Sequence, residues 1–451
     1  MKEIFGSKQF IRELFSIAIP LGLQSAITMI VNMIDTIMIG SLGDIALSAV
    51  NISGQFPYLC MTAAMGVSNA GLIIASQAFG NKRPDKVKSM IAFCLRITVV
   101  IGLIAFALCS LFPSQIISIY SDNPEIIQTG AKYLRPFAYA LLLQSISTVL
   151  VTMLRSAGIN KLGMYASLTA CFVNMAMNYV LIFGHFGFPA LGVFGAAIAT
   201  VIARVIEASV IIIVTFTDRK LGFRPKDFLL KTEKSMKDDF LKIGTPTIIS
   251  EMTATLNVSA AAMITGRVSS YYIAANSVVH SIWTISSLFM FGIGTGASVM
   301  IGHAIGADES ERAEEYARYF IRIAVIVGLI GALMTQVLAP VITSFFNVSD
   351  EAIATAGQLK YAASICVFFL AMQQVTCKGV LRGAGQAAVV TKVDLTSCWL
   401  VNIPAGFVVA LVLHAAPFWI SLSLRLDYVI KTVWGLYRIR KGSWIVRLNV
   451  D

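Results

Sequence analysis

The sequence predicts an all-α integral membrane protein with twelve transmembrane helices, arranged as two six-helix parallel-repeat lobes around a central cleft. Its 451 residues are 57% hydrophobic and only 13% charged, whereas about 25% of a soluble domain is charged. Its apolar runs are long enough to cross the roughly 30 Å hydrocarbon core of a bilayer. The two halves of the chain also repeat one another at a fixed offset, which is typical of internally duplicated membrane proteins.

Apolar runs punctuated by glycine, proline and charged residues define the predicted spans. They cover 14–40, 46–79, 88–112, 125–154, 160–184, 190–217, 240–266, 272–305, 319–345, 352–381, 386–413 and 416–437. Lys and Arg gather in the gaps after even-numbered spans and are nearly absent from the other gaps, where Arg267 is the exception. Because cytoplasmic loops attract positive charge, we expect a multi-pass protein of the cell inner membrane with both termini in the cytoplasm. These loops account for the formal charge of +11, so no nucleic-acid partner is expected.

The repeat is visible in short motifs. GVSNAGLIIASQAFG, ending at Gly80, matches GIGTGASVMIGHAIG, ending at Gly306, 226 positions later. The same shift carries Pro20 to Pro246, and LRSAG recurs as LRGAG at a shift of 227. An even number of spans per half gives both halves one orientation, an arrangement typical of transporters. The predicted divisions are an N-terminal lobe at 1–217, a cytoplasmic linker at 218–239, a C-terminal lobe at 240–437 and a cytoplasmic tail at 438–451.

One carboxylate, Asp35, lies inside the first apolar run. An acid at bilayer depth costs about 2.5–3.5 kcal/mol on insertion scales, so it indicates a cation, a partner or water. In the outer half of the first lobe, Asn174 and Asn178 on the fifth span and Thr200 on the sixth lie at a similar depth. The side-chain oxygens of Asp35, Asn174 and Asn178 are suitable ligands for Na⁺. The Asp35 carboxylate alone could instead bind H⁺. We predict an ion-coupling site; the alternatives are helix capping by Asp35 and hydrogen bonding between helices.

A second intramembrane acid, Glu251, lies near the midplane of the seventh span. We predict that it also couples ions, by exchanging a proton. A salt bridge is disfavoured because nearby bases, such as Lys378, lie toward the cytoplasmic helix ends and can extend to the interface. Pro20 and Pro246, inside the first and seventh spans, are predicted to bend those helices.

Other polar residues at membrane depth are candidates for lining a substrate cavity. These are Gln24, Gln55, Asn276, His280 and Gln373. Eighteen Met and 27 Phe residues suit an adaptable cavity for apolar guests, although such amides also serve as hydrogen-bonding links between helices. No GxxxxGK[ST], HExxH or GxSxG motif occurs, so neither ATP hydrolysis, nor an enzyme, nor a cofactor is predicted. The seven cysteines lie in apolar segments and are interpreted as core residues.

Several of these pieces together resemble the multidrug and toxic compound extrusion (MATE) family, with features of its NorM-like and DinF-like branches. They are AIPLGLQSAITMIVNMIDTIMIGSLG, GVSNAGLIIASQAFGNK, LRSAG, N…N…FG at 174–184, GAAIAT, the Pro and Glu of the seventh span, and LRGAG. The resemblance implies a two-lobe antiporter that expels organic cations, drugs or toxins in exchange for Na⁺ or H⁺. Its partners would be small cationic or amphipathic substrates and membrane lipids, and the chain would be a monomer.

The resemblance also assigns residues and exposes departures. It places the first-span Asp and fifth-span Asn positions in the ion site of the first lobe and the seventh-span acid in that of the second. NorM-like members add an acid in the tenth span, where Ala371, Met372 and Gln373 stand here. DinF-like members often have Asp where Asn178 stands. The alternative function is a flippase of the same superfamily for lipid-linked oligosaccharides or lipid precursors, which the mainly acidic charges at cavity depth disfavour.

Overall fold

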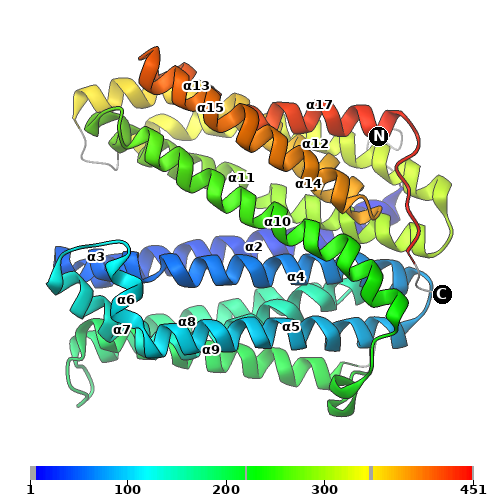
Figure 1. The fold of residues 1–451 in the computed structure, drawn as a ribbon, viewed down its shortest axis with the longest axis horizontal. Helices are drawn as coiled ribbons and strands as arrows, with labels where there is room; N and C mark the ends of the chain where they lie inside the picture. The colour runs from blue at the N-terminus through cyan, green and yellow to red at the C-terminus, as the bar shows by residue number, and fades with distance from the viewer. Residues whose placement is uncertain (1–6, 219–220, 345–348, 449–451) are drawn as a thin grey trace. The chain divides into compact units, whose positions relative to one another are not determined.

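The regular secondary structure of this protein is helical throughout the part that the structure describes (Figure 1). The computed structural model describes residues 7–218, 221–344 and 349–448. Within these ranges, 11 helices are long and apolar enough to cross a membrane. A helix satisfies its backbone polar groups internally, which is the requirement that lipid imposes on an apolar span. The predicted all-α membrane fold is confirmed.

The helices of the first half follow the predicted spans closely. They are α2 (Lys8–Gly40), α3 (Asp44–Ser53), α4 (Gln55–Gly80), α5 (Pro84–Leu111), α6 (Pro113–Ser118), α7 (Pro124–Leu154), η1 (Arg155–Ala157), α8 (Leu162–Phe183), α9 (Gly192–Thr217) and η2 (Pro225–Leu229). The second predicted span is divided into α3 and α4 at Gly54, and α2 and α7 run through internal prolines.

The second half is less regular. Its elements are α10 (Lys234–Thr265), α11 (Ser270–Gly306), α12 (Ser310–Thr343), α13 (Asp350–Gln373), η3 (Gln374–Leu381), α14 (Ala387–Leu395), η4 (Thr396–Asn402), α15 (Ile403–Phe407), η5 (Val408–Val412), α16 (Pro417–Ser423) and α17 (Leu426–Arg440). The segments η3, η4 and η5 are π-helices. A π-helical turn holds more residues than an α-turn and is frequent at functional sites. The faces of the tenth and eleventh spans therefore depart from the α-helical period.

The twelfth predicted span, 416–437, is broken in the structure. It consists of α16 and α17, and neither is long enough to be counted among the 11 spanning helices. The carbonyl of Leu424, between the two helices, accepts a hydrogen bond from the Asn402 amide at 2.9 Å. A side-chain donor thus satisfies a backbone group that the break releases from the helix.

The chain divides into two compact units, and each is described by itself. The carboxyl unit comprises Met1–Gly22, Ser76–Arg83 and Ser235–Asp451, and the amino unit comprises Leu23–Ala75 and Pro84–Lys234. The beginning of α2 and the end of α4 therefore belong to the carboxyl unit. The predicted division into lobes at 217 and 240 differs from these boundaries and stays a prediction.

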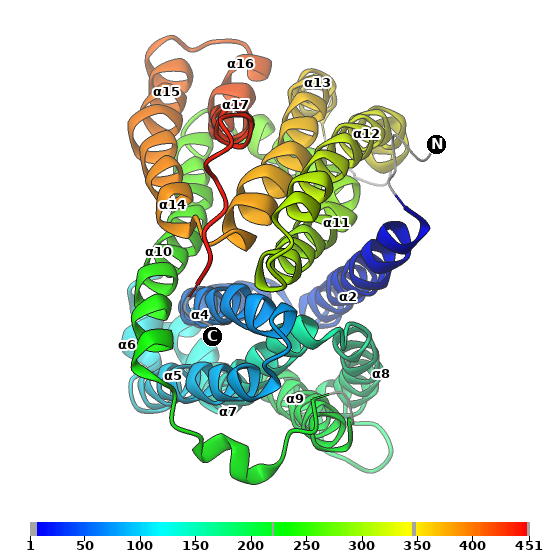
Figure 2. The same cartoon turned by 90° about the vertical axis from the view of Figure 1, so that its right-hand side faces the viewer.

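The amino unit packs around α7 and α9. In Figure 2, α5, α7, α8 and α9 lie side by side, and α7 contacts α5 and α9 while α8 contacts α9. One core cluster joins four helices through Ile39, Tyr133, Ile182 and Ala196. A Cβ added at Gly195 of α9 would lie 2.4 Å from the Leu181 carbonyl oxygen of α8. Small residues let these two helices approach closely, as expected in a membrane.

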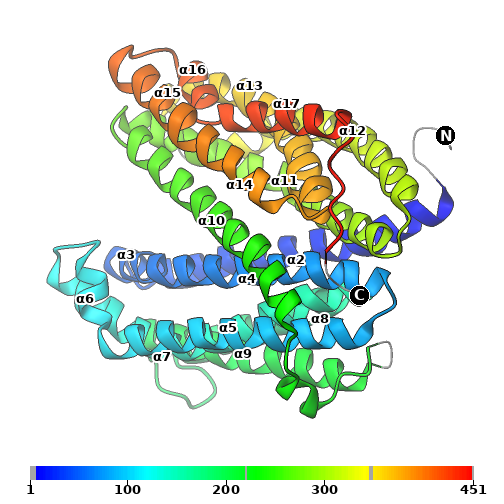
Figure 3. The ribbon, with the colours of Figure 1, turned by 45° about the vertical axis from the view of Figure 1, so that its right-hand side comes forward.

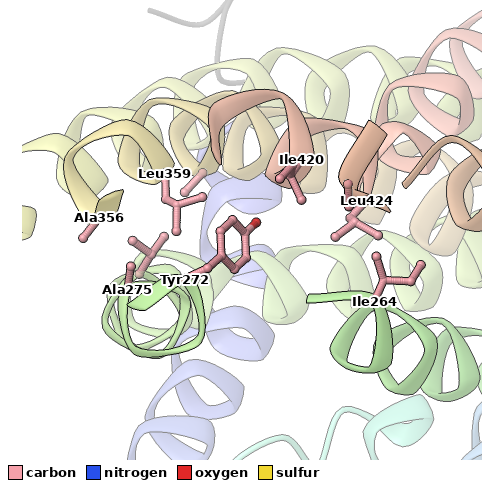
Figure 4. Packing of buried hydrophobic residues seen from close by; sticks show 10 residues of the cluster. Ile264, Tyr272, Ala275, Ala356, Leu359, Ile420 and Leu424 are labelled. Carbon is pink, nitrogen blue, oxygen red and sulfur yellow. The ribbon is translucent and has the colours of Figure 1, made fainter. Parts of the chain in front are cut away.

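The carboxyl unit packs α11 against α12 and α13. A buried cluster joins the ends of α10 and α11 to α13 and α16 (Figure 4). Its labelled members are Ile264, Tyr272, Ala275, Ala356, Leu359, Ile420 and Leu424. This apolar core holds α16, and Leu424 after it, against α10, α11 and α13.

The two repeat glycines pack reciprocally within the carboxyl unit. A Cβ added at Gly306 would lie 1.9 Å from the Gln77 carbonyl oxygen, and one at Gly80 would lie 2.2 Å from the His303 carbonyl oxygen. Real Cβ atoms are essentially never found at such distances. Equivalent positions of the repeat therefore allow the end of α4 to touch the end of α11 along the backbone.

This contact predicts a large cost for Gly306→Ala. We expect the substitution to lower the free energy of unfolding by about 3 kcal/mol, because the added methyl group must displace backbone. The measurement is thermal unfolding of the purified protein in detergent. The control is Gly357→Ala on α13, whose added Cβ meets nothing within 4 Å and should be neutral or stabilising. Equal melting temperatures for the two variants would contradict the packing.

The segment after α17 is packed against the carboxyl unit (Figure 3). Trp444 is only 2% exposed, and the Val446 N–H donates to the Ala384 carbonyl at 3.1 Å. The Gln77 side chain donates to the Val446 carbonyl at 3.3 Å and accepts from the Leu448 N–H at 3.0 Å. The end of the described chain thus ties the last turn of α4 to the loop before α14.

Candidate functional site

Four residues predicted to bind the coupling ion lie together in the amino unit. The Asn178 side-chain nitrogen donates to the Asp35 carboxylate at 2.6 Å and to the side-chain oxygen of Asn174 at 3.2 Å. Asn174 in turn lies 3.5 Å from the Thr200 hydroxyl. The two asparagines are one turn apart on α8 and so share one face. We call these four residues the Asp35 cluster.

The Asp35 cluster contains a buried acceptor that nothing satisfies. Asn178 is 1% exposed and Asn174 is 4% exposed, while Asp35 is partly buried. The side-chain oxygen of Asn178 has no hydrogen-bond partner. Leaving a buried acceptor unpaired costs about 1–3 kcal/mol. A carboxylate, two amide oxygens and a hydroxyl are ligands that fit Na⁺, so the residues present suit the predicted cation.

A base and a second acid lie beside this cluster, and sequence reasoning missed both. Arg204, on α9 one turn after Thr200, interacts electrostatically with Asp35. Its guanidinium also donates to the Glu207 carboxylate at 2.6 Å. Both charged residues lie inside the predicted sixth span, 190–217. An Arg and a Glu three residues apart in an apolar span indicate a buried ion pair, so the sequence contained the signal.

The predicted cavity residue Gln24 is part of a hydrogen-bonded chain. Its amide nitrogen donates to the Ser167 hydroxyl at 3.2 Å, and its oxygen accepts from Arg155 at 2.9 Å. The Ser167 hydroxyl lies 3.5 Å from the Glu207 carboxylate. We call Arg204, Glu207, Ser167, Gln24 and Arg155 the inner chain.

Glu251, the acid predicted in the second lobe, is ion-paired. Its carboxylate lies 2.6 Å from Arg382 and 3.4 Å from Lys378. The expectation that no base would reach Glu251 is wrong. The cause is local geometry: the residues from Gln374 to Leu381 form the π-helix η3, and Arg382 caps it with a side chain only 4% exposed.

The pairing extends into a network of six charges. Lys431 contacts Asp394 at 3.0 Å and Asp427 at 2.9 Å, and Arg382 lies 3.8 Å from Asp394. The Ser250 hydroxyl bonds to both Asp394 and Arg382. The six-charge network consists of the acids Glu251, Asp394 and Asp427 and the bases Lys378, Arg382 and Lys431. Three acids balance three bases, so the network as a whole carries no net charge.

Part of this network repeats the inner chain at equivalent positions. In both units an arginine contacts an uncharged polar residue, which contacts a third side chain. The equivalents, 226 or 227 positions apart, are Arg155, Gln24 and Ser167 in the amino unit and Arg382, Ser250 and Asp394 in the carboxyl unit. The duplication is therefore visible in side-chain contacts as well as in the sequence.

The remaining candidates lie apart from these networks. Gln55 is exposed and donates to the Asn51 carbonyl at 3.4 Å, and exposed His280 lies beside the Trp283 ring at 5.8 Å. Asn276 is partly buried. Gln373 is 3% exposed, and its side-chain oxygen has no hydrogen-bond partner. Their place in a substrate cavity stays a prediction.

The two prolines predicted to bend helices lie inside unbroken ones. Pro20 is within α2 and Pro246 within α10. The Pro246 carbonyl accepts a hydrogen bond from the Thr391 hydroxyl at 2.7 Å, and such bonds re-satisfy a backbone that proline disturbs. Bending at either proline stays a prediction.

Comparison with known proteins settles the family. The MatE family model matches residues 20–180 and 246–408, which is most of the chain in two copies. The chain belongs to the MatE family. The two matches of this MatE protein begin at Pro20 and Pro246, the prolines that the repeat makes equivalent. Members of the family are transporters and not enzymes. The predicted membership of the MATE family and the prediction that the chain is not an enzyme are therefore confirmed.

Relatives match nearly the whole MatE chain. It is 24% identical over 440 residues to the probable multidrug resistance protein YoeA of Bacillus subtilis, covering 95% of this chain and 94% of that one. It is 25% identical over 439 residues to the probable multidrug resistance protein NorM of Thermotoga maritima, covering 96% and 93%.

Solved structures show the same fold. A mutant of the Vibrio cholerae MATE transporter VcmN aligns with a TM-score of 0.86 at 16% identity, covering 96% of this chain and 97% of that one. A MOP superfamily transporter from Pyrococcus furiosus aligns with a TM-score of 0.83 at 17% identity, covering 97% of each chain.

Proposed function

We propose that this MatE transporter exports organic cations, drugs or toxins from the cell in exchange for inward-moving Na⁺ or H⁺. The observation that supports this most directly is the Asp35 cluster, in which the Asn178 amide nitrogen donates to an intramembrane acid while the side-chain oxygen of Asn178 is buried and unpaired. The names of the curated relatives describe multidrug resistance. In this proposal the protein acts as a monomer in the inner membrane, with both termini in the cytoplasm and the cleft opening to each side in turn.

The Asp35 cluster is the better of the two predicted ion sites. A cation that enters the Asp35 cluster gains oxygen ligands and neutralises the charge of Asp35. Glu251, by contrast, already has Arg382 and Lys378 as partners and would have to release a base before binding a cation. We therefore assign the coupling ion to Asp35, Asn174 and Asn178, with Thr200 at the edge of the site.

Competition supplies the coupling in this proposal. An acid that binds either the inward-moving ion or a cationic drug cannot hold both equally well, so each lowers the affinity for the other. Such a coupling is typically worth about 1–3 kcal/mol and is reciprocal. The flippase alternative gains no support from YoeA or NorM, whose names describe multidrug resistance.

The test is transport by purified protein in liposomes. A fluorescent organic cation is supplied on the side equivalent to the cytoplasm, and either a Na⁺ gradient or a pH gradient is imposed. We expect uphill movement of the dye under one gradient, with dissipation of that gradient and loss of movement when an ionophore collapses it. Dye flux that equilibrates without accumulation under both gradients would overturn the proposal and indicate a passive channel.

A further inference from the structure

The amino unit holds a second intramembrane acid that the proposed function does not use. Glu207, on α9, is 6% exposed. One carboxylate oxygen accepts from Arg204 at 2.6 Å, and the other lies 3.5 Å from the Ser167 hydroxyl. A buried carboxylate at membrane depth is costly unless a function or a partner compensates it.

Arg204 stands between this acid and the ion-coupling cluster. Thr200, Arg204 and Glu207 are spaced by four and three residues on α9, so their side chains share one face of the helix. Arg204 interacts electrostatically with Asp35 while its guanidinium bonds to Glu207. Arg204 is therefore ion-paired with Glu207 at 2.6 Å, and only its longer-range charge acts on Asp35.

The inner chain extends this arrangement along the unit. Gln24 and Asp35 are eleven residues apart on α2, as are Ser167 and Asn178 on α8, which corresponds to about 16 Å along each axis. Glu207 from α9 pairs directly with Arg204, and Asp35 from α2 and Tyr133 from α7 are close enough to interact with its charge. Arg155 lies at the far end of the chain, beyond Gln24.

In the carboxyl unit, the position equivalent to Arg204 is also occupied by a base. Lys431 stands 227 positions after Arg204 and contacts two carboxylates at once, Asp394 at 3.0 Å and Asp427 at 2.9 Å. Asp427 in turn is the equivalent of Thr200. The base is therefore repeated, whereas the acids beside it are not, since Ala262 and Trp434 stand 227 positions after Asp35 and Glu207.

We propose that Glu207 sets the cation affinity of the Asp35 cluster by holding Arg204 away from Asp35. When a cation occupies Asp35, it repels Arg204, which pairs fully with Glu207. When the cation leaves, the guanidinium of Arg204 shifts toward Asp35, and its positive charge stabilises the negative charge of the empty site. Glu207 is thus a positioning residue that does not itself bind the transported ion. This inference rests on the proposed function, because it assumes that Asp35 binds the coupling cation.

The test is a double-mutant cycle on Glu207 and Arg204 in reconstituted liposomes. The measured quantity is the concentration of driving cation that gives half-maximal exchange, with substrate affinity in detergent as the second readout. We expect Glu207→Gln to raise that concentration about tenfold, because Arg204 then pairs with Asp35 alone, and Arg204→Gln to lower it about tenfold. In the Arg204→Gln background, Glu207→Gln should no longer raise it. Affinity for the cationic substrate, measured without the driving cation, should shift in the same direction as the cation affinity in each variant, because the same acid binds both in the proposed competition.

Two controls separate this role from a structural one. Glu207→Asp keeps the charge and should keep the cation dependence of the wild type. Glu314→Gln removes an exposed carboxylate on α12 and should change neither readout. A Glu207→Gln effect that persists in the Arg204→Gln background, or unchanged cation dependence in Glu207→Gln, would overturn the inference while leaving the proposed function intact. Cation dependence that survives Asp35→Asn would instead overturn the proposed function.

Discussion

Replacing Asp35 with Asn should lower the rate of cation-driven export about 100-fold, the upper part of the range for coupling between two bound ligands. The amide has nearly the shape of the carboxylate and can still accept the hydrogen bond that Asn178 donates at 2.6 Å. It lacks the charge that attracts Na⁺ and cannot take up a proton near neutral pH. The variant should therefore fold normally, bind cationic substrate more weakly and fail to couple substrate movement to the ion gradient.

The measurement is uptake of a fluorescent cation under the driving gradient, together with elution from a size-exclusion column to verify folding. Asp44→Asn is the matched control, because it makes the same change at an exposed carboxylate at the start of α3. We expect Asp44→Asn to transport like the wild type. Full export by Asp35→Asn would exclude the Asp35 cluster as the coupling site.

The Asp35 cluster could be predicted because the depth of each residue in its span and the α-helical period together determine which side chains can meet. Asn174 and Asn178, four residues apart, must share a face of any α-helix. Their depth on the fifth span placed them level with Asp35, and α2, α8 and α9 are regular helices where these residues lie. Hydropathy and the repeat likewise predicted the fold, since lipid leaves an apolar span few alternatives to a helix.

The six-charge network could not be predicted in the same way. Five of its six charges lie within the predicted spans and Arg382 lies in the gap after the tenth, but the directions of Lys378 and Arg382 depend on η3, which is a π-helix. The α-helical period gives wrong faces after such a turn. Depth alone predicted that Lys378 extends toward the cytoplasmic interface, whereas it lies 3.4 Å from Glu251. The second acid of this unit, Asp394, comes from the eleventh span and not from the tenth.

Replacing Arg382 with Met should unfold much of the carboxyl unit. The substitution removes a base that contacts Glu251 at 2.6 Å and Asp394 at 3.8 Å. Breaking a buried ion pair from one side costs about 3–5 kcal/mol, because the remaining charge stays buried without its partner. The network would then hold three acids and two bases. We expect a large loss of folded protein and a melting temperature well below that of the wild type.

The double variant Glu251→Gln with Arg382→Met should recover most of that loss, because it removes one acid and one base and restores neutrality. Arg447→Met is the control, since its ion pair with Asp308 joins side chains that are 42% and 73% exposed and is worth about 0–1 kcal/mol. Equal stability of the Arg382→Met and Arg447→Met variants would contradict the network.

The same double variant also separates the two candidate ion sites. If Glu251 served only to balance Arg382, the folded double variant would keep cation-driven export, since the Asp35 cluster is untouched. If Glu251 bound the coupling ion, the double variant would fold and yet lose the dependence of export on the gradient. Because folding and coupling are read out separately, the double variant shows whether Glu251 is structural or binds the coupling ion.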